Sequence, residues 1–294
     1  MALLEHAART QFASTAECSE YRKLSGRLLE FTSKVPTCEY FGDRWLAGGE
    51  SAEPREFPHM ASLGWRKASL YNTIFFRCGG SLISERFILT AAHCLVHIGG
   101  VFPSFVRLGE VNLLRHNDEM HPDDYEIEGY FPHPHFRRRN GKYNDIALLK
   151  LTQDVTFGDS IRPACLYGEE TSPSEEVFAT GYGSQAYYED FSNKLVKASL
   201  EIYDNKRCDE KYAGTRALPL GMTDGQLCAG GKISGHDTCP GDSGGPLQVT
   251  DQENDCVFVV FGIISFGSYC GGINPAIYTR VAAYLDWIEG IVWP

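Results

Sequence analysis

The chain has 294 residues, of which 43% are hydrophobic and 22% are charged, values typical of a globular protein. This composition excludes a chain that is disordered throughout, a coiled coil and a collagen-like fibre. Its 38 Asp and Glu residues outnumber its 27 Lys and Arg residues, which gives a net charge of −11 and no cationic surface for a nucleic-acid backbone. We therefore expect no nucleic-acid partner, and the arginine run at residues 137–139 is interpreted as a solvated loop.

Membrane-spanning and leader segments are not expected in this chain. A spanning helix needs about 18 or more consecutive apolar residues, whereas the longest apolar run, residues 257–266, is short, contains a glycine and is interpreted as a buried strand. Residues 1–17 carry an acid and a histidine where a signal peptide needs an apolar core. A cleaved leader is thus expected either to be missing from this chain or never to have been present.

The remaining elements predict a mostly β protein after a short N-terminal extension. A modest helical pattern runs through Leu24, Leu28 and Phe31. From residue 46 onward, short apolar runs alternate with Gly, Pro and Asn, which indicates an all-β barrel or sandwich. These candidate strands are residues 75–76, 81–83, 87–89, 106–108, 146–151, 177–180, 195–202 and 257–265. Residues 281–292 have helical spacing and predict a C-terminal helix.

Cysteine usage points to an oxidising compartment. The chain contains ten cysteines, an even number, with no CxxC pair and no Cys/His cluster at zinc spacing. Five disulfide bonds are therefore predicted, and secretion with them. Spacing alone leaves the pairing open.

Three short motifs supply the parts of a nucleophilic catalyst. Gly241-Asp242-Ser243-Gly244-Gly245-Pro246 places a serine between glycines, where the backbone must approach another group closely. A nucleophilic serine needs a base to take its proton, and the base needs a carboxylate to fix its tautomer. TAAHC, which contains His93, and NDIAL, which contains Asp145, supply these two groups.

The three motifs, in this order, resemble those of the chymotrypsin-type serine proteases. The resemblance covers residues 46–294 and includes CGGSLIS at 78–84, RPACL at 162–166, TGYG at 180–183 and YTRVAAYLDWI at 278–288. It implies an all-β fold of two six-stranded antiparallel β-barrels with a C-terminal helix and the active site between the barrels. It also implies that His93 is the general base, Asp145 its orienting carboxylate and Ser243 the nucleophile. The N–H groups of Gly241 and Ser243 would form the oxyanion hole.

The same resemblance assigns the substrate pocket. Asp237 matches the acid at the base of the trypsin-type pocket, where a buried carboxylate selects Arg or Lys before the scissile bond. Ser265 and Gly267 match the strand that pairs with the substrate backbone. Ala276 stands where trypsin-like members usually carry glycine, so its methyl group is expected to crowd the pocket floor. Pro240, just before Gly241 of the expected oxyanion hole, is a second departure from the family pattern.

The resemblance further implies a zymogen in two parts: an activation peptide or light chain at 1–45, without a complete clip domain, and a protease domain at 46–294. The family pattern places the new N-terminus at Leu46, so that cleavage follows Trp45 and the freed amino group pairs with Asp242. Because Trp45 is not basic, we expect an activator with chymotrypsin-like preference and little self-activation.

By position, the resemblance implies three disulfide bonds within the protease domain: Cys78–Cys94, Cys208–Cys228 and Cys239–Cys270. It also implies that Cys165 holds the activation peptide. We favour Cys38 as its partner, which would leave Cys18 with Cys256 and give two tethers. CSEY at 18–21 and the spacing to LAGG resemble the arthropod clip-type proteases, nearest to the snake-like group.

No cofactor is expected for catalysis and no catalytic metal. Glu110, Asn112 and the acids at 118–119 lie where some relatives bind calcium, although the spacing is a residue or two off, so a structural calcium is a minor alternative. His133 and His135 are interpreted as part of a turn and not as a metal site.

Together these features predict a secreted, trypsin-like serine endopeptidase made as a zymogen. The implied partners are a protein substrate such as a downstream zymogen, an upstream activating protease and a serpin-type inhibitor. One alternative is a binding protein that keeps the protease surface without turnover. A second is elastase-like or narrow specificity imposed by Ala276.

Overall fold

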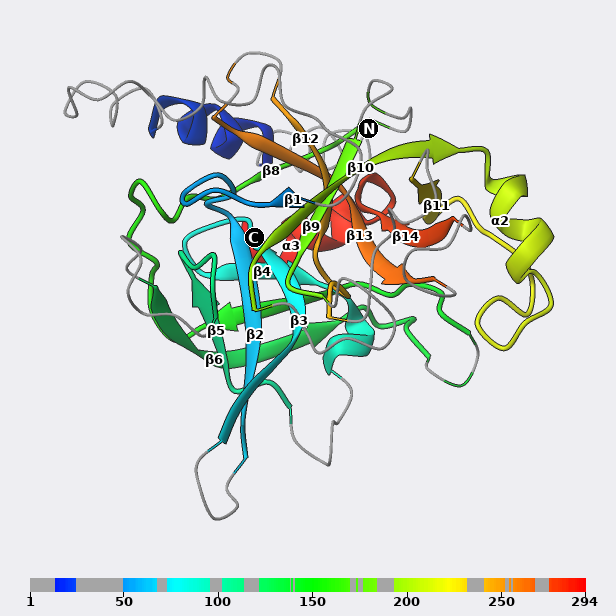
Figure 1. Ribbon diagram of the computed structural model, residues 1–294, viewed down its shortest axis with the longest axis horizontal. Coiled ribbons are helices and arrows are strands. Elements are labelled where there is room, and N and C mark those ends of the chain that lie inside the picture. The colour runs from blue at the N-terminus through cyan, green and yellow to red at the C-terminus, as the bar shows by residue number, and fades with distance from the viewer. Residues whose placement is uncertain are drawn as a thin grey trace.

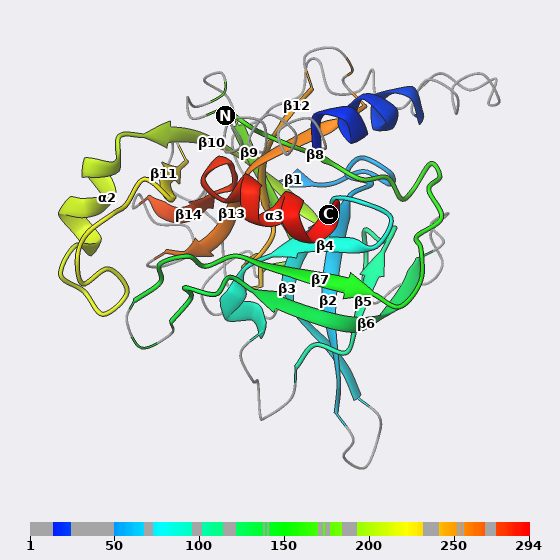
Figure 2. The ribbon, with the colours of Figure 1, turned by 180° about the vertical axis from the view of Figure 1, so that it is seen from behind.

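The computed structural model describes residues 14–24, 50–67, 73–95, 102–113, 122–137, 139, 141–169, 173, 177–183, 193–231, 241–251, 254, 256–267 and 275–294. These segments form two β-barrels that lie side by side (Figures 1 and 2). No helix in the described part of the chain is long and apolar enough to cross a membrane.

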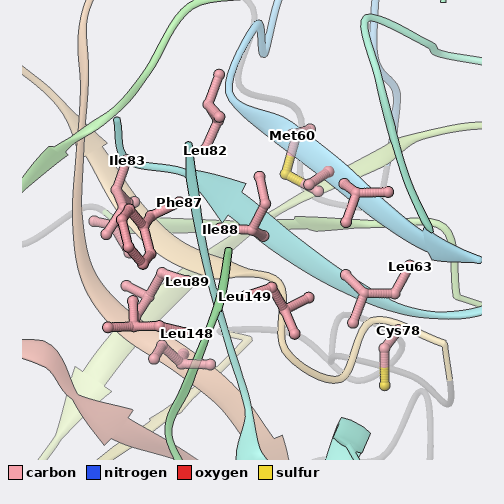
Figure 3. Packing of buried hydrophobic residues seen from close by; sticks show 14 of the residues in the cluster. Met60, Leu63, Cys78, Leu82, Ile83, Phe87, Ile88, Leu89, Leu148 and Leu149 are labelled. Carbon is pink, nitrogen blue, oxygen red and sulfur yellow. The ribbon is translucent and has the colours of Figure 1, made fainter. Parts of the chain in front are cut away.

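The first barrel is a closed sheet of six antiparallel strands in the order β2-β3-β4-β7-β6-β5. Their bounds are β2 Met60–Lys67, β3 Thr73–Leu82, β4 Phe87–Thr90, β5 Phe105–Leu108, β6 Asp123–Pro132 and β7 Ala147–Leu151. Strand β4 is buried along its whole length, as expected of the apolar sequence FILT in a barrel interior. Figure 3 shows the packing within this barrel, where Met60, Leu63, Leu82, Ile88 and Leu149 meet in one core.

The second barrel closes through β9-β10-β11-β14-β13-β12 and back to β9. Its strands are β9 Val177–Gly181, β10 Val196–Tyr203, β11 Gln226–Gly230, β12 Pro246–Thr250, β13 Phe258–Phe266 and β14 Ala276–Arg280. Two short strands extend this sheet: β1 Glu50–Ser51 pairs with β10, and β8 Cys165–Leu166 runs parallel to β13. The predicted double barrel is therefore confirmed.

Helices lie outside the barrels. Besides a helix over residues 14–24, the described helices are η2 Ala92–Leu95, α2 Asn205–Tyr212, η4 Val281–Tyr284 and α3 Leu285–Val292. Helix α2 begins where the Asp204 carboxylate accepts the N–H of Lys206, at 2.8 Å. The predicted C-terminal helix is present, but its first turn is a 3₁₀ helix, η4, that continues into α3. Part of the predicted N-terminal helix is described, over residues 14–24, and Leu28 and Phe31 lie outside the described residues.

The helix over residues 14–24 lies beside β8 and contacts both barrels. Cys18 forms a disulfide bond with Cys165 of β8, with the two Cα atoms 5.2 Å apart. The Tyr21 hydroxyl donates to the Ile83 carbonyl at 3.2 Å, and the Arg22 guanidinium donates to both carboxylate oxygens of Asp251 at 3.0 and 2.7 Å. In Figure 2 this helix lies along the same side of the molecule as β8 and β12.

This packing corrects the expected tether. The favoured pairing of Cys38 with Cys165 was wrong, and so was that of Cys18 with Cys256, because the docked helix places Cys18 against Cys165. Cys256 is also disulfide-bonded. Its partner lies outside the described residues, as does Cys38. Spacing could not decide between the pairings because the choice follows from the contacts of Tyr21 and Arg22 with the barrel.

A buried polar group joins the two barrels. His59, just before β2, lies with its Nε2 2.5 Å from the Gln248 side-chain oxygen in β12. Gln248 in turn donates to the Thr180 hydroxyl in β9 at 3.2 Å. The His59 ring also packs against Phe258, with ring centroids 5.0 Å apart. Burial lowers the pKa of His59 to about 3, since the protonated ring would have to be charged in an apolar interior.

This shift predicts acid destabilisation. A pKa that is lower in the folded than in the unfolded chain means that His59 favours folding above about pH 6.5 and that this contribution is lost as pH falls toward 3. Between pH 6.5 and 5 the free energy of unfolding should fall by about 2 kcal/mol through His59 alone. Urea unfolding of the parent and of His59→Gln, which does not titrate, checks this. Equal losses in the two proteins would contradict it.

Candidate active site

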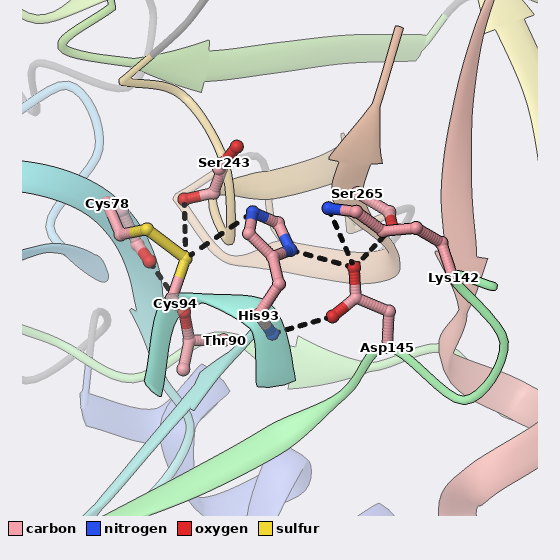
Figure 4. The surroundings of a disulfide bond; sticks show 9 residues. Cys78, Thr90, His93, Cys94, Lys142, Asp145, Ser243 and Ser265 are labelled. Atoms are coloured by element: carbon pink, nitrogen blue, oxygen red, sulfur yellow. Dashed lines mark hydrogen bonds and ion pairs between the residues drawn. A yellow bond between two sulfur atoms is a disulfide. The ribbon is translucent and has the colours of Figure 1, made fainter. Parts of the chain in front are cut away.

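The structure brings the three motif residues together from both barrels. His93 lies in η2, which follows β4, and Asp145 lies just before β7, so both belong to the first barrel. Ser243 lies in the turn before β12 of the second barrel. Figure 4 shows the His93 ring between Asp145 and Ser243. The three side chains therefore meet where the barrels face each other.

Asp145 holds His93 at two points. Its Oδ1 accepts the backbone N–H of His93 at 2.8 Å, and its Oδ2 lies 2.7 Å from Nδ1 of the ring. This contact favours the tautomer with the proton on Nδ1, which leaves the lone pair of Nε2 for another proton. The arrangement can thus act as a general base.

The serine and the base are close but not yet hydrogen-bonded. Within the described part of the chain, Ser243 Oγ makes no hydrogen bond to His93, and His93 Nε2 has a 3.9 Å contact with Cys94 Sγ. The Ser243 backbone is fixed instead, because its carbonyl accepts the N–H of Gly79 at 2.9 Å. Catalytic hydrogen bonds are often long in a free enzyme and shorten when substrate binds.

Asp145 remains ionised although it is fully buried. Burial by itself raises its pKa, but the charge and hydrogen bond of His93, the charge of Lys142 and the hydroxyl of Ser265 together lower the pKa to about 2. The side chain of Asp145 has no exposed surface, whereas that of His93 is 20% exposed. A permanent carboxylate can therefore stabilise a transient positive charge on His93.

Three further side chains contact Asp145, and the sequence did not predict these contacts. The hydroxyl of Ser265 in β13 donates to Oδ2, and the Lys142 ammonium lies 4.0 Å from the same oxygen. The hydroxyl of Thr279 in β14 donates to the Asp145 carbonyl at 2.9 Å. Lys142 is near Asp145 in sequence, but no signal in the sequence places Thr279, 134 residues away, at this point.

The backbone around Ser243 has the conformation that its glycines permit. Gly241 and Gly244 have φ of 106° and 83°, in the region that favours glycine. A Cβ on Gly244 would lie 2.3 Å from the Thr90 hydroxyl oxygen and 2.6 Å from the Gly79 carbonyl oxygen, so the turn packs tightly on the first barrel. Among the described residues, nothing accepts the N–H groups of Gly241 and Ser243. These two N–H groups are thus available to a substrate oxygen.

The Asp242 side chain lies in a space lined by Gly181 and Gly183. Its Oδ1 accepts the N–H of Gly183 at 2.7 Å. A Cβ on Gly181 would lie only 2.0 Å from the same oxygen, and one on Gly183 would lie 2.5 Å from Oδ2. The TGYG motif therefore leaves room for this carboxylate.

Part of the predicted substrate pocket is described. Ser265 is buried at the end of β13, and Gly267 follows that strand. Ala276 is fully buried in β14, where it pairs with Ala229 and packs among apolar residues of the second barrel. Asp237, Pro240, Trp45 and Leu46 lie outside the described residues, as do Cys239 and Cys270. The expectations for these six residues, and for crowding by Ala276, remain predictions.

Two of the implied disulfide bonds are present in the structure. Cys78 is bonded to Cys94, next to His93, and Cys208 is bonded to Cys228, which joins α2 to β11. The first bond links β3 to η2 and so fixes the segment that carries His93 (Figure 4).

The described residues do not fit a metal site. Cys78, His93 and Cys94 cluster together, but the two cysteines are joined in a disulfide and cannot act as thiolate ligands. In the candidate calcium loop, Glu110 is buried and its Oε1 accepts the N–H groups of Val111 and Asn112, both at 2.8 Å. Asp118 and Glu119 lie outside the described residues. The structural calcium remains a prediction.

The pair of histidines belongs to a turn. The His133 ring nitrogen Nδ1 accepts the N–H of His135 at 3.3 Å, and the His133 ring packs edge-on against Tyr284 and Trp287. These contacts anchor the turn on the C-terminal helices.

Comparison with known proteins agrees with this geometry. The family described as Trypsin matches residues 46–288. Serine protease snk of Drosophila melanogaster is 39% identical over 96% of this chain, and phenoloxidase-activating factor 3 of Holotrichia diomphalia is 36% identical over 94%. The alignments cover 66% of the first relative, just under two thirds, and 82% of the second. Other arthropod relatives are CLIP domain-containing serine proteases of Anopheles gambiae.

Among solved structures, mouse neuropsin, a serine protease expressed in the limbic system, has a similar fold. The TM-score is 0.66 at 29% sequence identity, and the match covers 83% of this chain and 99% of neuropsin. The double barrel, the sequence match over most of the chain and these relatives lead to one conclusion. The chain belongs to the trypsin family of serine proteases.

Proposed function

We propose that this chain is a serine endopeptidase, secreted as a zymogen, that cleaves proteins after Arg or Lys in an extracellular cascade. The main support for the catalytic part of this proposal is that Asp145 contacts His93 at two points, while Ser243 lies on the other side of the His93 ring. This contact fixes both the tautomer and the orientation of the base.

In the proposed mechanism, Ser243 Oγ attacks the carbonyl carbon of the scissile bond while His93 Nε2 takes its proton. Asp145 stays ionised and stabilises the imidazolium that forms. The N–H groups of Gly241 and Ser243 stabilise the negative oxygen of the tetrahedral intermediate. His93 then gives its proton to the leaving amine, an acyl-enzyme remains on Ser243, and water releases it by the reverse sequence of proton transfers.

The proposed preference for Arg or Lys rests on Asp237. A carboxylate at the base of the pocket would be left unpaired by an apolar side chain, and leaving a buried charge unpaired is costly. Ser265 and Gly267 would pair with the substrate backbone, as the resemblance implies. Ala276, fully buried in β14, is the position where the relative preference for Arg and Lys would be set.

The proposed activation is cleavage after Trp45, which frees the amino group of Leu46 to pair with Asp242. The glycine-lined space around Asp242, with its contact to Gly183, supports a role for this carboxylate next to the nucleophile. Residues 1–45 are the proposed light chain and residues 46–294 the protease domain. The Cys18–Cys165 bond and the Arg22–Asp251 ion pair would keep the light chain attached after cleavage.

The proposed substrate is another protein, the next zymogen of a cascade. One relative, phenoloxidase-activating factor 3, is named for an activating role, which supports such a role here. Another relative, melanization protease 1, supports a role in melanization. An upstream protease and a serpin-type inhibitor are the further partners proposed. The disulfide bonds present in the structure support an extracellular location.

Hydrolysis of a short Arg-terminated chromogenic substrate tests the proposal. We expect activity to appear after treatment with chymotrypsin, together with a new N-terminus at Leu46, and not after treatment with trypsin. The cleaved light chain should leave the protease domain only under reducing conditions. Cleavage at Trp45 without activity toward Arg or Lys substrates would contradict the proposal, and so would an active chain that begins at Trp45.

A further inference from the structure

We infer that Lys142 is a positioning residue for the His93–Asp145 pair: its ammonium shares the Asp145 carboxylate with His93 and so keeps the base unprotonated at lower pH. The inference rests on the proposed catalytic roles of His93 and Asp145. It assigns a function to a side chain that none of the three catalytic motifs requires.

One carboxylate oxygen of Asp145 is shared among three groups. Oδ2 lies 2.7 Å from His93 Nδ1 and 4.0 Å from Lys142 Nζ, and it accepts the hydroxyl of Ser265. Figure 4 shows the Lys142 ammonium next to this oxygen and the His93 ring, and Ser265 on the side of the oxygen away from His93. The negative charge that holds His93 is therefore offset in part by a neighbouring positive charge.

The position of Lys142 is set by the second barrel. Its backbone N–H donates to the Ala217 carbonyl at 2.7 Å, and its carbonyl accepts the side-chain amide of Gln226 at 3.3 Å. Its ammonium lies 5.8 Å from the centre of the Phe266 ring. The Lys142 side chain is 31% exposed while Asp145 is fully buried, so the interaction is only partly screened by water.

The other described groups that contact Asp145 or interact with its charge, apart from His93, do not supply a positive charge. Ser265 of β13 and Thr279 of β14 are neutral hydroxyl donors. Burial and the negative charge of Asp145 raise the pKa of Tyr284 in η4 to about 12. Tyr284 is therefore neutral over the pH range of the activity profile. Among these described neighbours, Lys142 is the permanent cation.

The sign of the effect follows from the chemistry of the base. His93 must be unprotonated to take the proton of Ser243, so activity falls when acid protonates it. An undiminished negative charge on Asp145 favours the protonated ring, and the Lys142 ammonium opposes this. Removing the ammonium should therefore protonate the base at a higher pH and move the acid limb of the activity profile upward.

The experiment compares pH profiles of kcat/KM for the activated full chain at constant ionic strength. We expect Lys142→Met and Lys142→Gln to move the midpoint of the acid limb upward by about 0.5 pH unit. Lys142→Arg, which keeps the charge, should leave the midpoint unchanged. The matched control is Lys150→Met, because Lys150 lies in β7 of the same barrel but pairs with Glu128, at 2.8 Å.

Each outcome decides the matter. A lower plateau with an unmoved midpoint in both neutral variants would show that Lys142 acts through packing alone and would overturn the inference. An equal shift in Lys150→Met would also overturn it, since any lost cation would then have the same effect. Activity that survives Ser243→Ala would overturn the proposed catalytic function itself. If Lys142→Met does not fold, the Lys142→Gln and Lys142→Arg pair gives the answer.

Discussion

Replacement of Ser243 by alanine is expected to lower kcat/KM by about 10⁶-fold while the protein stays folded. The variant keeps His93 and Asp145 but has no oxygen to attack the scissile carbonyl, so no acyl-enzyme can form. The backbone contact of residue 243 to Gly79 does not involve the side chain and should persist. Hydrolysis of an Arg-terminated substrate measures the loss, with the variant quantified as total cleaved protein and the active sites of the parent counted by a burst titration.

The control for this variant is a serine outside the proposed machinery. Ser104 precedes β5, and its hydroxyl contacts the Gly64 carbonyl at 3.5 Å in the first barrel. Ser104→Ala should retain activity within about twofold, because removing a weak surface contact changes stability by about 0.5 kcal/mol or less. Far-UV circular dichroism of both variants checks that they are folded. A Ser243→Ala protein with more than a thousandth of the parent activity would contradict the assignment.

Much of the fold could be predicted because its signals are local. Several barrel strands, such as β4, β5, β7 and β9, are short apolar runs, and the barrels bury most of their residues. The candidate catalytic residues could be found for the same reason. His93, Asp145 and Ser243 each lie in a motif whose neighbours fix the local backbone, such as Gly244 at φ 83°. That the three residues lie next to one another could be seen only in the folded structure.

What could not be predicted depends on contacts between distant segments. Cys18 bonds Cys165, 147 residues away, because Tyr21 and Arg22 anchor the helix on the barrel. Cysteine spacing carries no information about such anchors. Ser265 was expected to serve the substrate backbone, yet its hydroxyl also donates to Asp145 across the barrel interface. Side-chain direction at that point follows from the register of β13 with β14, which the sequence does not state.

A second large effect is expected from Gly181→Ala, which should lower kcat/KM by about 100-fold or more. The added Cβ would lie 2.0 Å from Asp242 Oδ1, 2.7 Å from its Cγ and 2.9 Å from its Cβ. Because the whole side chain is in the way, rotating the carboxylate alone does not relieve the clash. Asp242 must shift, and with it the adjoining Gly241 and Ser243, whose N–H groups are the proposed oxyanion donors.

A control variant and a stability measurement separate a geometric effect on the active site from a general loss of stability. Gly158→Ala is the matched control, since a Cβ there meets nothing within 4 Å, and it should leave kcat/KM unchanged. Thermal unfolding identifies the fraction of Gly181→Ala that is folded at the assay temperature, and kcat/KM is then taken per folded molecule. A displaced oxyanion hole lowers kcat more than it raises KM, because its donors act chiefly on the transition state. Full activity of folded Gly181→Ala would mean that the position of the Asp242 carboxylate does not control Ser243.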